Sequence, residues 1–261
     1  MTPRAAMNRK IPMALAVAAI VFAACAKTDP YRRLEPELPL VQSQAELLAA
    51  YNNRWPDRFK CVQTVTIDFG PVTRTLVGYL IVQKPGKFRL QCMTEQGIRL
   101  LDIVGNSYGP KTLFAAEEFD DVTVDRISRN IAQVFLHVVR PSNKVQPGRG
   151  GGIREWWEAT GNGIELVQGR GAPEPNLFFR ARLTGNPPQV DWIKACWNEA
   201  NQYRIDHYEW RNLGESLRPS VIVLRDRATL PRGRPYKLTI QLTELTAQQQ
   251  PWPESTFMGN K

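Results

Sequence analysis

The sequence has few of the residues on which most catalytic and metal sites are built. Only two of its 261 residues are histidines, His137 and His207, and they lie far apart along the chain. The four cysteines have none of the spacings that zinc sites use, and no H-E-x-x-H or G-x-S-x-G motif occurs. The glycine-rich stretch "GRGGGIRE" lacks the Lys-Ser/Thr pair of a phosphate-binding loop. We therefore expect a protein that is not an enzyme and that holds no cofactor and no metal.

The sequence also lacks an apolar run long enough to cross a membrane as a helix. Its longest apolar run extends from Ile11 to Ala24 and has 14 residues, whereas a membrane-spanning helix needs about 20. Arg9 and Lys10 stand directly before it. A basic segment followed by a short apolar run is typical of a secretory signal peptide. We predict that residues 1–24 are such a peptide.

The apolar run ends in "VFAAC", in which Cys25 resembles the cysteine of a bacterial lipobox. That cysteine is diacylated on sulfur, becomes the first residue after cleavage and is then acylated on its amino group. Phe22 stands where Leu is usual, and the alternative is a plain signal peptide with an incidental cysteine. One acyl chain gives only marginal membrane binding, whereas two or more give a stable anchor. We predict that Cys25 is the lipidation site and the membrane anchor.

The other cysteines, Cys61, Cys92 and Cys196, are an odd set for an oxidising compartment. At most one disulfide can form among them. Buried free thiols are an equally good interpretation.

Basic residues exceed acidic ones, but they are scattered along the chain. The net charge is +9, and it falls to +6 without Arg4, Arg9 and Lys10, which precede the apolar run. Most of the others occur singly within apparent strands, as in "GYLIVQKPGKFRLQC". A solvated sheet face explains this pattern better than a nucleic-acid patch. We expect no nucleic-acid partner, and none more specific than anionic lipid headgroups.

The segment after Cys25 is typical of a tether that leads into a folded domain. Residues 25–42 include Pro30, Pro36 and Pro39, a composition that favours an extended chain. Ser43, with Glu46 three residues later, forms a capping-box pattern that opens a helix in "SQAELLAAYNNRW". The folded domain is predicted to cover residues 43–258.

Alternation of apolar and polar residues predicts a mainly β domain. Four strands joined by short turns are expected at 59–70, 73–83, 87–93 and 98–109, and seven more between 153 and 245. Apolar residues at helical spacing between Val124 and Val138 predict a second helix, and Asp120 and Asp121 favour its start. Weak cation binding by the acidic cluster Glu117, Glu118, Asp120 and Asp121 is the alternative. We predict an α+β fold: an unclosed antiparallel half-barrel with a helical lid.

A half-closed barrel covered by a helix leaves an apolar interior between the two. The residues predicted to line a cavity there are Leu80, Val82, Phe88, Leu90, Ile131, Phe135, Leu238 and Ile240. Alternation alone does not distinguish a lined cavity from a filled core, and the residues themselves favour the core.

Two stretches of the sequence resemble the LolA/LolB superfamily of periplasmic lipoprotein carriers and outer-membrane receptors. They are "GYLIVQKPGKFRLQCMTEQGIRLLDIVGNSYG" and "VIVLRDRATLPRGRPYKLTIQLTEL", the latter followed by Phe257. The resemblance extends over residues 43–258 and implies an unclosed barrel whose cavity accommodates acyl chains. The receptor branch carries an exposed Leu in the turn after the third strand, which here reads Met93 to Gln96.

Together these features predict an envelope lipoprotein, anchored in the outer membrane and facing the periplasm. We expect it to bind or transfer lipid or lipidated protein, with acyl chains as its ligands. The alternative is a non-catalytic scaffold or sensor that binds an envelope protein partner. Nothing in the sequence indicates an oligomeric state.

Overall fold

We describe the fold from a computed structural model of the chain. It describes residues 29–40, 43–106, 109–139, 153–170, 178–198, 201–227 and 235–258. The chain divides into two units, Met1–Tyr31 and Arg32–Lys261. Cys25 and the predicted signal peptide lie outside the described residues, and all that follows concerns the second unit.

The described residues of the second unit form twelve strands, two α-helices and one short 3-10 helix. In chain order these are α2 (Gln44–Asn52), β1 (Arg58–Asp68), β2 (Thr73–Gln83), β3 (Lys87–Met93), β4 (Arg99–Asn106), β5 (Gly109–Ala115), α3 (Asp121–Phe135), β6 (Ile153–Thr160), β7 (Gly163–Arg170), β8 (Phe178–Thr184), β9 (Gln189–Asn198), β10 (Asn201–Leu213), β11 (Ser216–Asp226), β12 (Tyr236–Ala247) and η1 (Glu254–Phe257).

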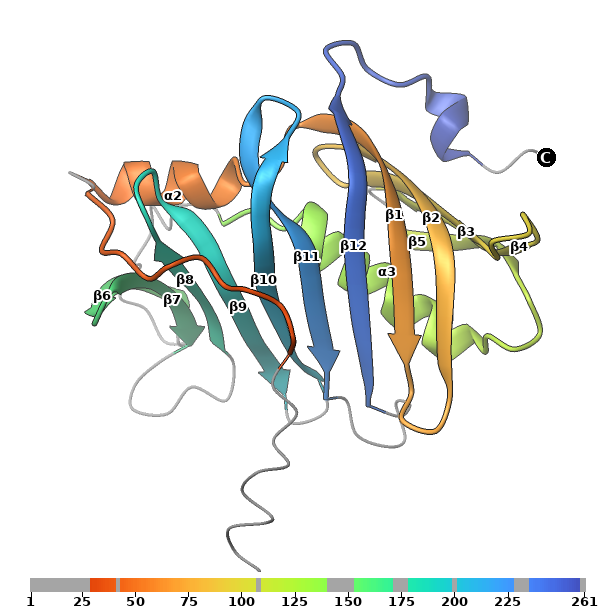
Figure 1. The fold of residues 1–261 in the computed structure, drawn as a ribbon, viewed down its shortest axis with the longest axis horizontal. Coiled ribbons are helices and arrows are strands. Elements are labelled where there is room, and N and C mark those ends of the chain that lie inside the picture. Colours follow the sequence, from red (N-terminus) through yellow and green to blue (C-terminus); the bar gives the residue numbers. More distant parts are fainter. Residues whose placement is uncertain are drawn as a thin grey trace, which may run out of the picture. The chain divides into compact units, whose positions relative to one another are not determined.

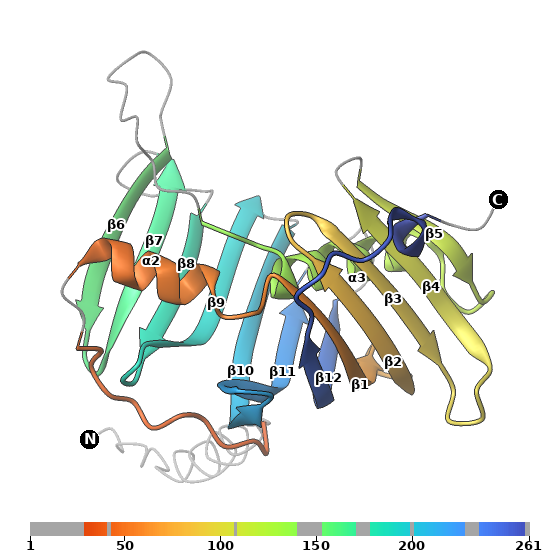
Figure 2. The same ribbon diagram turned by 90° about the horizontal axis from the view of Figure 1, so that it is seen from above.

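All twelve strands belong to one antiparallel sheet with the order β5-β4-β3-β2-β1-β12-β11-β10-β9-β8-β7-β6. The chain therefore starts in the middle of the sheet, runs to one edge, crosses to the other edge and returns to the middle beside β1 (Figures 1 and 2). The edge strands β5 and β6 share no ladder among the described residues, so the sheet is unclosed. The predicted half-barrel is confirmed.

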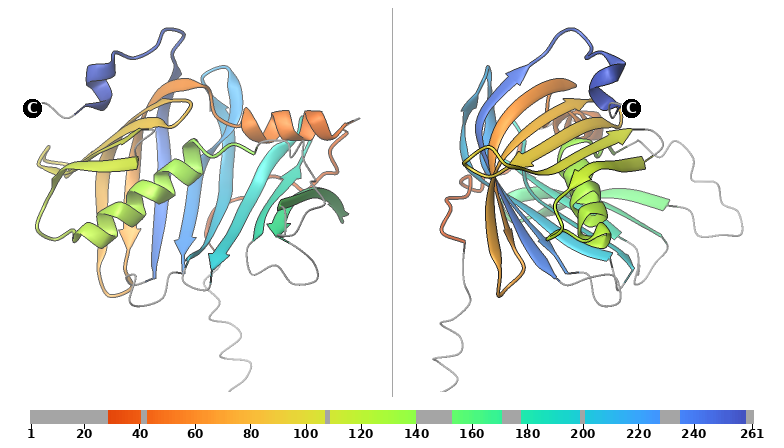
Figure 3. Two further views of the ribbon diagram at one scale, coloured as in Figure 1. Left: turned by 180° about the vertical axis from the view of Figure 1, so that it is seen from behind. Right: turned by 90° about the vertical axis from the view of Figure 1, so that its right-hand side faces the viewer.

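Helix α3 is the segment that crosses from one edge of the sheet towards the other. The sheet curves around it, so that α3 lies against the concave face (Figure 3). Its buried residues Val124, Ile127, Ile131, Val134 and Phe135 recur at helical spacing, which is why one side of the helix packs on the sheet. The predicted helical cover is confirmed.

Both helices begin at the residues that the sequence indicates. The Ser43 hydroxyl accepts a hydrogen bond from the Glu46 backbone N–H at 3.3 Å. The Asp120 carboxylate accepts one from the Thr123 N–H at 2.6 Å. Each cap satisfies a backbone donor that the first helical turn leaves without a partner.

Two elements differ from the sequence expectation. Strand β5 was not expected as a separate strand, because "GPKTLFA" is mostly exposed and pairs only with β4 at the sheet edge. The C-terminal tail, beyond the last expected strand, contains η1, which packs against β3 and β4 and buries Phe257. β5 is thus stabilised by pairing with the strand before it, and η1 by packing on strands far from it in the sequence.

Residues 32–40 run along the convex face of the sheet, on the side away from α3 (Figure 1). The Glu209 backbone N–H donates to the Arg32 carbonyl, and the Gly185 N–H donates to the Glu37 carbonyl, both at 2.8 Å. Part of the segment predicted as a tether is thus bound to the domain. We call residues 32–40 the N-terminal strap.

No helix in the described part of the chain has the length and apolar character that a membrane span requires.

Candidate functional site: the apolar interior under α3

The interior between the concave face and α3 is one continuous apolar cluster. All eight residues predicted to line it belong to this cluster, and each is at most 3% exposed: Leu80, Val82, Phe88, Leu90, Ile131, Phe135, Leu238 and Ile240. The structure therefore brings the predicted residues of both sheet halves and of the helix together. That they line a ligand cavity stays a prediction.

Strand register places these residues side by side. Leu80 lies opposite Leu90, and Val82 lies opposite Phe88, on β2 and β3. The Phe88 ring in turn covers Gly105 on β4, where an added Cβ would come within 2.0 Å of the ring. A glycine is thus needed at position 105 because an aromatic side chain occupies the space above it.

Gln63 and His207 are buried polar side chains beside this interior that the list of predicted lining residues does not contain. Gln63 on β1 is 1% exposed, and its Oε1 lies 3.8 Å from the Cys61 Sγ. Its amide occupies the space that the absent side chain of Gly78 leaves on β2. Alternation along β1 could have revealed Gln63, because it shares the buried face with Phe59 and Val65.

The second buried polar side chain, His207, is held neutral. Its Nδ1 lies 2.7 Å from the Val190 carbonyl oxygen, and burial lowers its pKa to about 3. Burial raises the pKa of the thiols of Cys61 and Cys92 to about 12, so both stay protonated. These two thiols are free, as one of the two interpretations of the sequence expected.

The middle of α3 is fastened to the sheet by a buried polar group of four residues. Arg126 pairs with Asp226 of β11, with 3.0 Å between the guanidinium nitrogen and the carboxylate oxygen. The Asn130 amide donates to the same carboxylate at 2.9 Å and to the Tyr236 hydroxyl at 2.6 Å. The Arg126 guanidinium also lies over the Tyr236 ring. We call these four residues the α3 latch.

The C-terminal end of α3 is held by the segment around α2. The Trp55 indole N–H donates to the Val134 carbonyl at 2.9 Å. Just beyond the helix, the Tyr51 hydroxyl lies 2.8 Å from the His137 Nδ1, and the His137 ring stacks on Phe179. Burial, with a smaller contribution from Arg54, lowers the pKa of His137 to about 4. This end of the cover is therefore largely aromatic, with the Arg54 guanidinium over the Tyr51 ring as a nearby cation.

The arrangement offers apolar surface rather than reactive groups. Both histidines are neutral near pH 7, and the thiols of Cys61 and Cys92 are protonated. Within the described ranges, no three His, Cys, Asp or Glu side chains are grouped as a metal site would require. An apolar ligand entering this interior would gain about 25 cal/mol for each Å² removed from water.

Comparison of the sequence with family models gives no match, and comparison with curated proteins gives none either. Solved structures do match. A LolA superfamily protein from Nitrosomonas europaea is 9% identical, with a TM-score of 0.51, over 84% of this chain and 98% of that chain. A domain assigned to outer-membrane lipoprotein sorting in Vibrio parahaemolyticus is 8% identical, with a TM-score of 0.45, over 80% of this chain and 95% of that chain.

A third solved structure, a DUF1329 family protein from Desulfovibrio piger, is 10% identical, with a TM-score of 0.44. It matches over 82% of this chain and 97% of that chain. At 9% identity, the match to the Nitrosomonas europaea protein shows a likeness of fold alone.

Proposed function

We propose that this chain, which has the fold of the LolA/LolB-like superfamily, is an envelope lipoprotein that binds or transfers acyl chains. In this proposal Cys25 carries the anchor, the outer membrane receives it, and the domain faces the periplasm. The ligand is lipid or the acylated end of a lipidated protein. No step of chemistry is required of the protein.

One observation carries the proposal: the apolar interior is covered by a single helix with few polar attachments. Alongside the latch, the Trp55 contact and a hydrogen bond of 2.9 Å from the Tyr203 hydroxyl of β10 to the Gln133 side chain, α3 packs on the sheet through apolar side chains such as Ile127 and Ile131. Apolar contacts are not directional, so an acyl chain can replace them without leaving a polar group unpaired.

The turn after β3 departs from the receptor branch, which carries an exposed Leu there. No Leu stands in this turn, and Met93 at the end of β3 is half-buried. Ile98, at the other end of the turn, is 63% exposed. In our proposal Ile98 is the side chain that contacts the membrane during transfer.

The proposal is tested with the chain lacking residues 1–24 and carrying Cys25→Ser, which retains the whole compact unit. We expect copurified lipid in mass spectra and saturable binding of the fluorescent fatty acid parinaric acid. Ile131→Trp fills the interior beneath α3 and should abolish binding. Val122→Trp, on the exposed side of the same helix, should leave it unchanged.

A wild-type protein that neither carries lipid nor takes up parinaric acid would overturn the proposal. Specific capture of one envelope protein under those conditions would favour the scaffold alternative instead.

A further inference from the structure

A buried amide on β1 has a donor that the fold does not use. Gln63 is 1% exposed, and alternation places it on the buried face of β1, between Cys61 and Val65. The Cys61 thiol donates to its Oε1 at 3.8 Å, whereas its Nε2 has no hydrogen-bond partner among the described residues. A neutral donor is thus buried with no acceptor in this part of the chain.

Strand register surrounds the Gln63 amide with buried residues that carry no amide or charge. Gln63 lies opposite Leu242 of β12 on one side and Gly78 of β2 on the other. Gly78 lies opposite Cys92 of β3, and Cys92 lies opposite Leu101 of β4. All four neighbours are buried. Gln63 is therefore the amide in an otherwise apolar row across five strands.

Gly78 leaves the room that this amide takes. A Cβ added at Gly78 would come within 3.0 Å of the Gln63 Cγ and 3.1 Å of its Nε2. A glycine in a strand often marks such a close approach. The Gln63 amide therefore lies over β2, on the side of the sheet that carries the apolar cluster.

Helix α3 carries a second buried polar group of this kind. Ser128 is 1% exposed, and none of the described residues forms a hydrogen bond with its Oγ. It lies one helical turn from Val124 and from Ile131, which belong to the apolar cluster. The sheet and its helical cover thus each bury one neutral hydroxyl or amide donor at the interior.

Both donors are unfavourable for the folded protein by itself. A buried donor without an acceptor costs free energy, whereas an apolar side chain of similar size at the same place does not. Leu at position 63 and Ala at position 128 would serve the packing without this cost. The two polar groups therefore indicate that a ligand supplies the acceptors.

The chemistry of the two donors limits what that ligand can be. A carboxylate or phosphate would bury a net charge against neutral donors, which costs more than the hydrogen bonds return. A hydroxyl or a protonated carboxylic acid brings a further donor that needs its own acceptor, and a plain hydrocarbon leaves both donors unpaired. The carbonyl oxygen of an acyl ester only accepts, is uncharged and is joined directly to an apolar chain.

We propose that Gln63 and Ser128 make the interior selective for ester-linked acyl chains, whose carbonyl oxygens accept hydrogen bonds from the Gln63 Nε2 and the Ser128 hydroxyl. This inference rests on the proposed function, because acyl chains have to enter the interior, and it names their chemical class. Phospholipids and the diacylglyceryl group of a lipidated protein each carry two such esters.

The test measures displacement of parinaric acid from the chain lacking residues 1–24 with Cys25→Ser. The competitors are dioctanoyl phosphatidylcholine and its dioctyl ether analogue, which lacks the two carbonyl groups. We expect the wild type to bind the ester about tenfold more tightly than the ether. Gln63→Leu should remove most of this preference and Ser128→Ala part of it, in both cases by weakening ester binding alone.

The matched control is Leu242→Met, which alters the packing beside Gln63 without removing a donor and should keep the wild-type preference. Thermal unfolding should show Gln63→Leu to be at least as stable as the wild type, because the lost amide donor had no partner.

Equal affinity of the wild type for ester and ether would overturn the ester inference and leave acyl-chain binding standing. So would an ester preference that survives in Gln63→Leu/Ser128→Ala, or a markedly lower unfolding temperature of Gln63→Leu. Failure to bind parinaric acid and both lipids would overturn the proposed function as well.

A second comparison distinguishes the two sources of the ester. A synthetic S-dioctanoylglyceryl-cysteine peptide carries the same acyl esters as dioctanoyl phosphatidylcholine. Tighter binding of the peptide would support a lipidated protein as the ligand, and tighter binding of the phospholipid would support a lipid. In either case Gln63→Leu should weaken the tighter ligand about tenfold, and unchanged binding of that ligand would overturn the inference.

Discussion

At the residue scale, His137 is a group whose protonation would oppose its surroundings. It lies between the Tyr51 hydroxyl and the Phe179 ring, and Arg54 is nearby. Protonation would place a cation among aromatic rings and beside another cation. The folded protein therefore keeps the imidazole neutral well below the pH at which an exposed histidine gains its proton.

This predicts an acid-sensitive contribution to stability. The pKa of His137 is about 4 when folded and 6.5 when unfolded, so between these values only the unfolded chain binds the proton. Stability should fall as the pH drops through this range, by a total that approaches about 3 kcal/mol. Urea unfolding at about pH 7 and about pH 4.5 measures the change.

The control for this prediction is the variant His137→Gln, whose side chain keeps a polar partner for Tyr51 and does not titrate. It should lose less stability between the two pH values than the wild type. Identical losses would show that His137 does not carry the effect.

At the element scale, α3 carries two Arg–Asp pairs that differ in burial. Arg126–Asp226 is buried in the latch, with 8% and 10% of the two side chains exposed, whereas Arg129–Asp125 lies on the outer side of the helix, about half exposed. A buried charge that loses its partner costs much more than an exposed one, because water cannot replace the partner.

We therefore expect Asp226→Asn to destabilise the protein by about 3 kcal/mol or more, since it leaves the Arg126 charge buried. Asp125→Asn should cost about 0.5 kcal/mol or less. Denaturant unfolding of both variants measures the two changes. Similar values for the two would mean that the latch does not hold α3.

Most of the helices and strands could be predicted from the sequence, because apolar and polar residues alternate along strands that have one buried face. β2 and β3 begin and end where the pattern does, and Ser43 and Asp120 mark their helices. β5 was not identified as a separate strand, because the side chains of this edge strand are mostly exposed and do not alternate between apolar and polar. The sequence does not reveal that five basic residues on β8 to β12 lie side by side, because each strand holds one of them. Only the strand register shows that they are neighbours: Arg180, Lys194, Arg204, Arg225 and Lys237.

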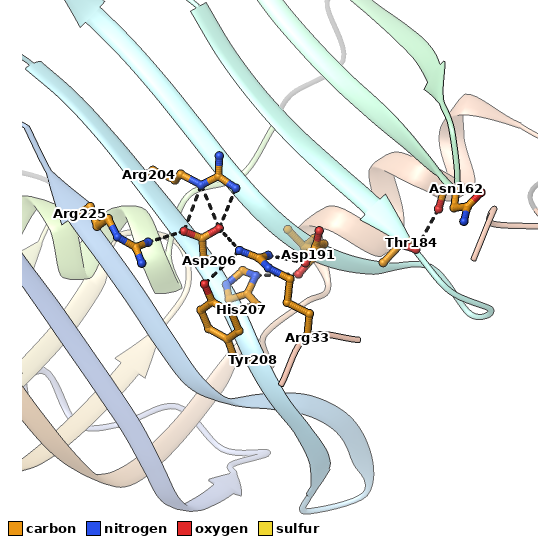
Figure 4. Close-up of polar contacts among 10 residues, drawn as sticks. Arg33, Asn162, Thr184, Asp191, Arg204, Asp206, His207, Tyr208 and Arg225 are labelled. Carbon is orange, nitrogen blue, oxygen red and sulfur yellow. Dashed lines mark hydrogen bonds and ion pairs between the residues drawn. The ribbon is translucent and has the colours of Figure 1, made fainter. Parts of the chain in front are cut away.

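At the scale of the whole second unit, Arg33 joins the strap to the sheet through ion pairs (Figure 4), in addition to the backbone hydrogen bonds of the strap. Arg33 binds Asp191 at 2.9 Å and Asp206 at 2.7 Å, and its guanidinium lies over the Tyr208 ring. Arg32, its neighbour, has a side chain that is 78% exposed and pairs within the strap, with Glu35.

We expect Arg33→Gln to release the strap and to expose it to proteinase K, with little change in the unfolding temperature of the barrel. Arg32→Gln should leave cleavage at the wild-type rate. Mass spectrometry of the first cleavage products locates the cut. Resistance of both variants would show that the backbone hydrogen bonds of the strap are sufficient.

The strand topology also affects the order in which the strands pair during folding. Among the described strands, ten of the eleven ladders join strands that follow each other in the chain, and only β1 with β12 joins distant ones. Strands β1 to β5 and strands β6 to β12 can therefore each pair with their neighbours in the chain. Pairing of β1 with β12 requires the ends of a long chain segment to meet, which is slower. Because β12 is the last of the described strands, β1 remains an open edge until β12 is available to pair with it. Until then, that edge is the place where a second chain would pair first.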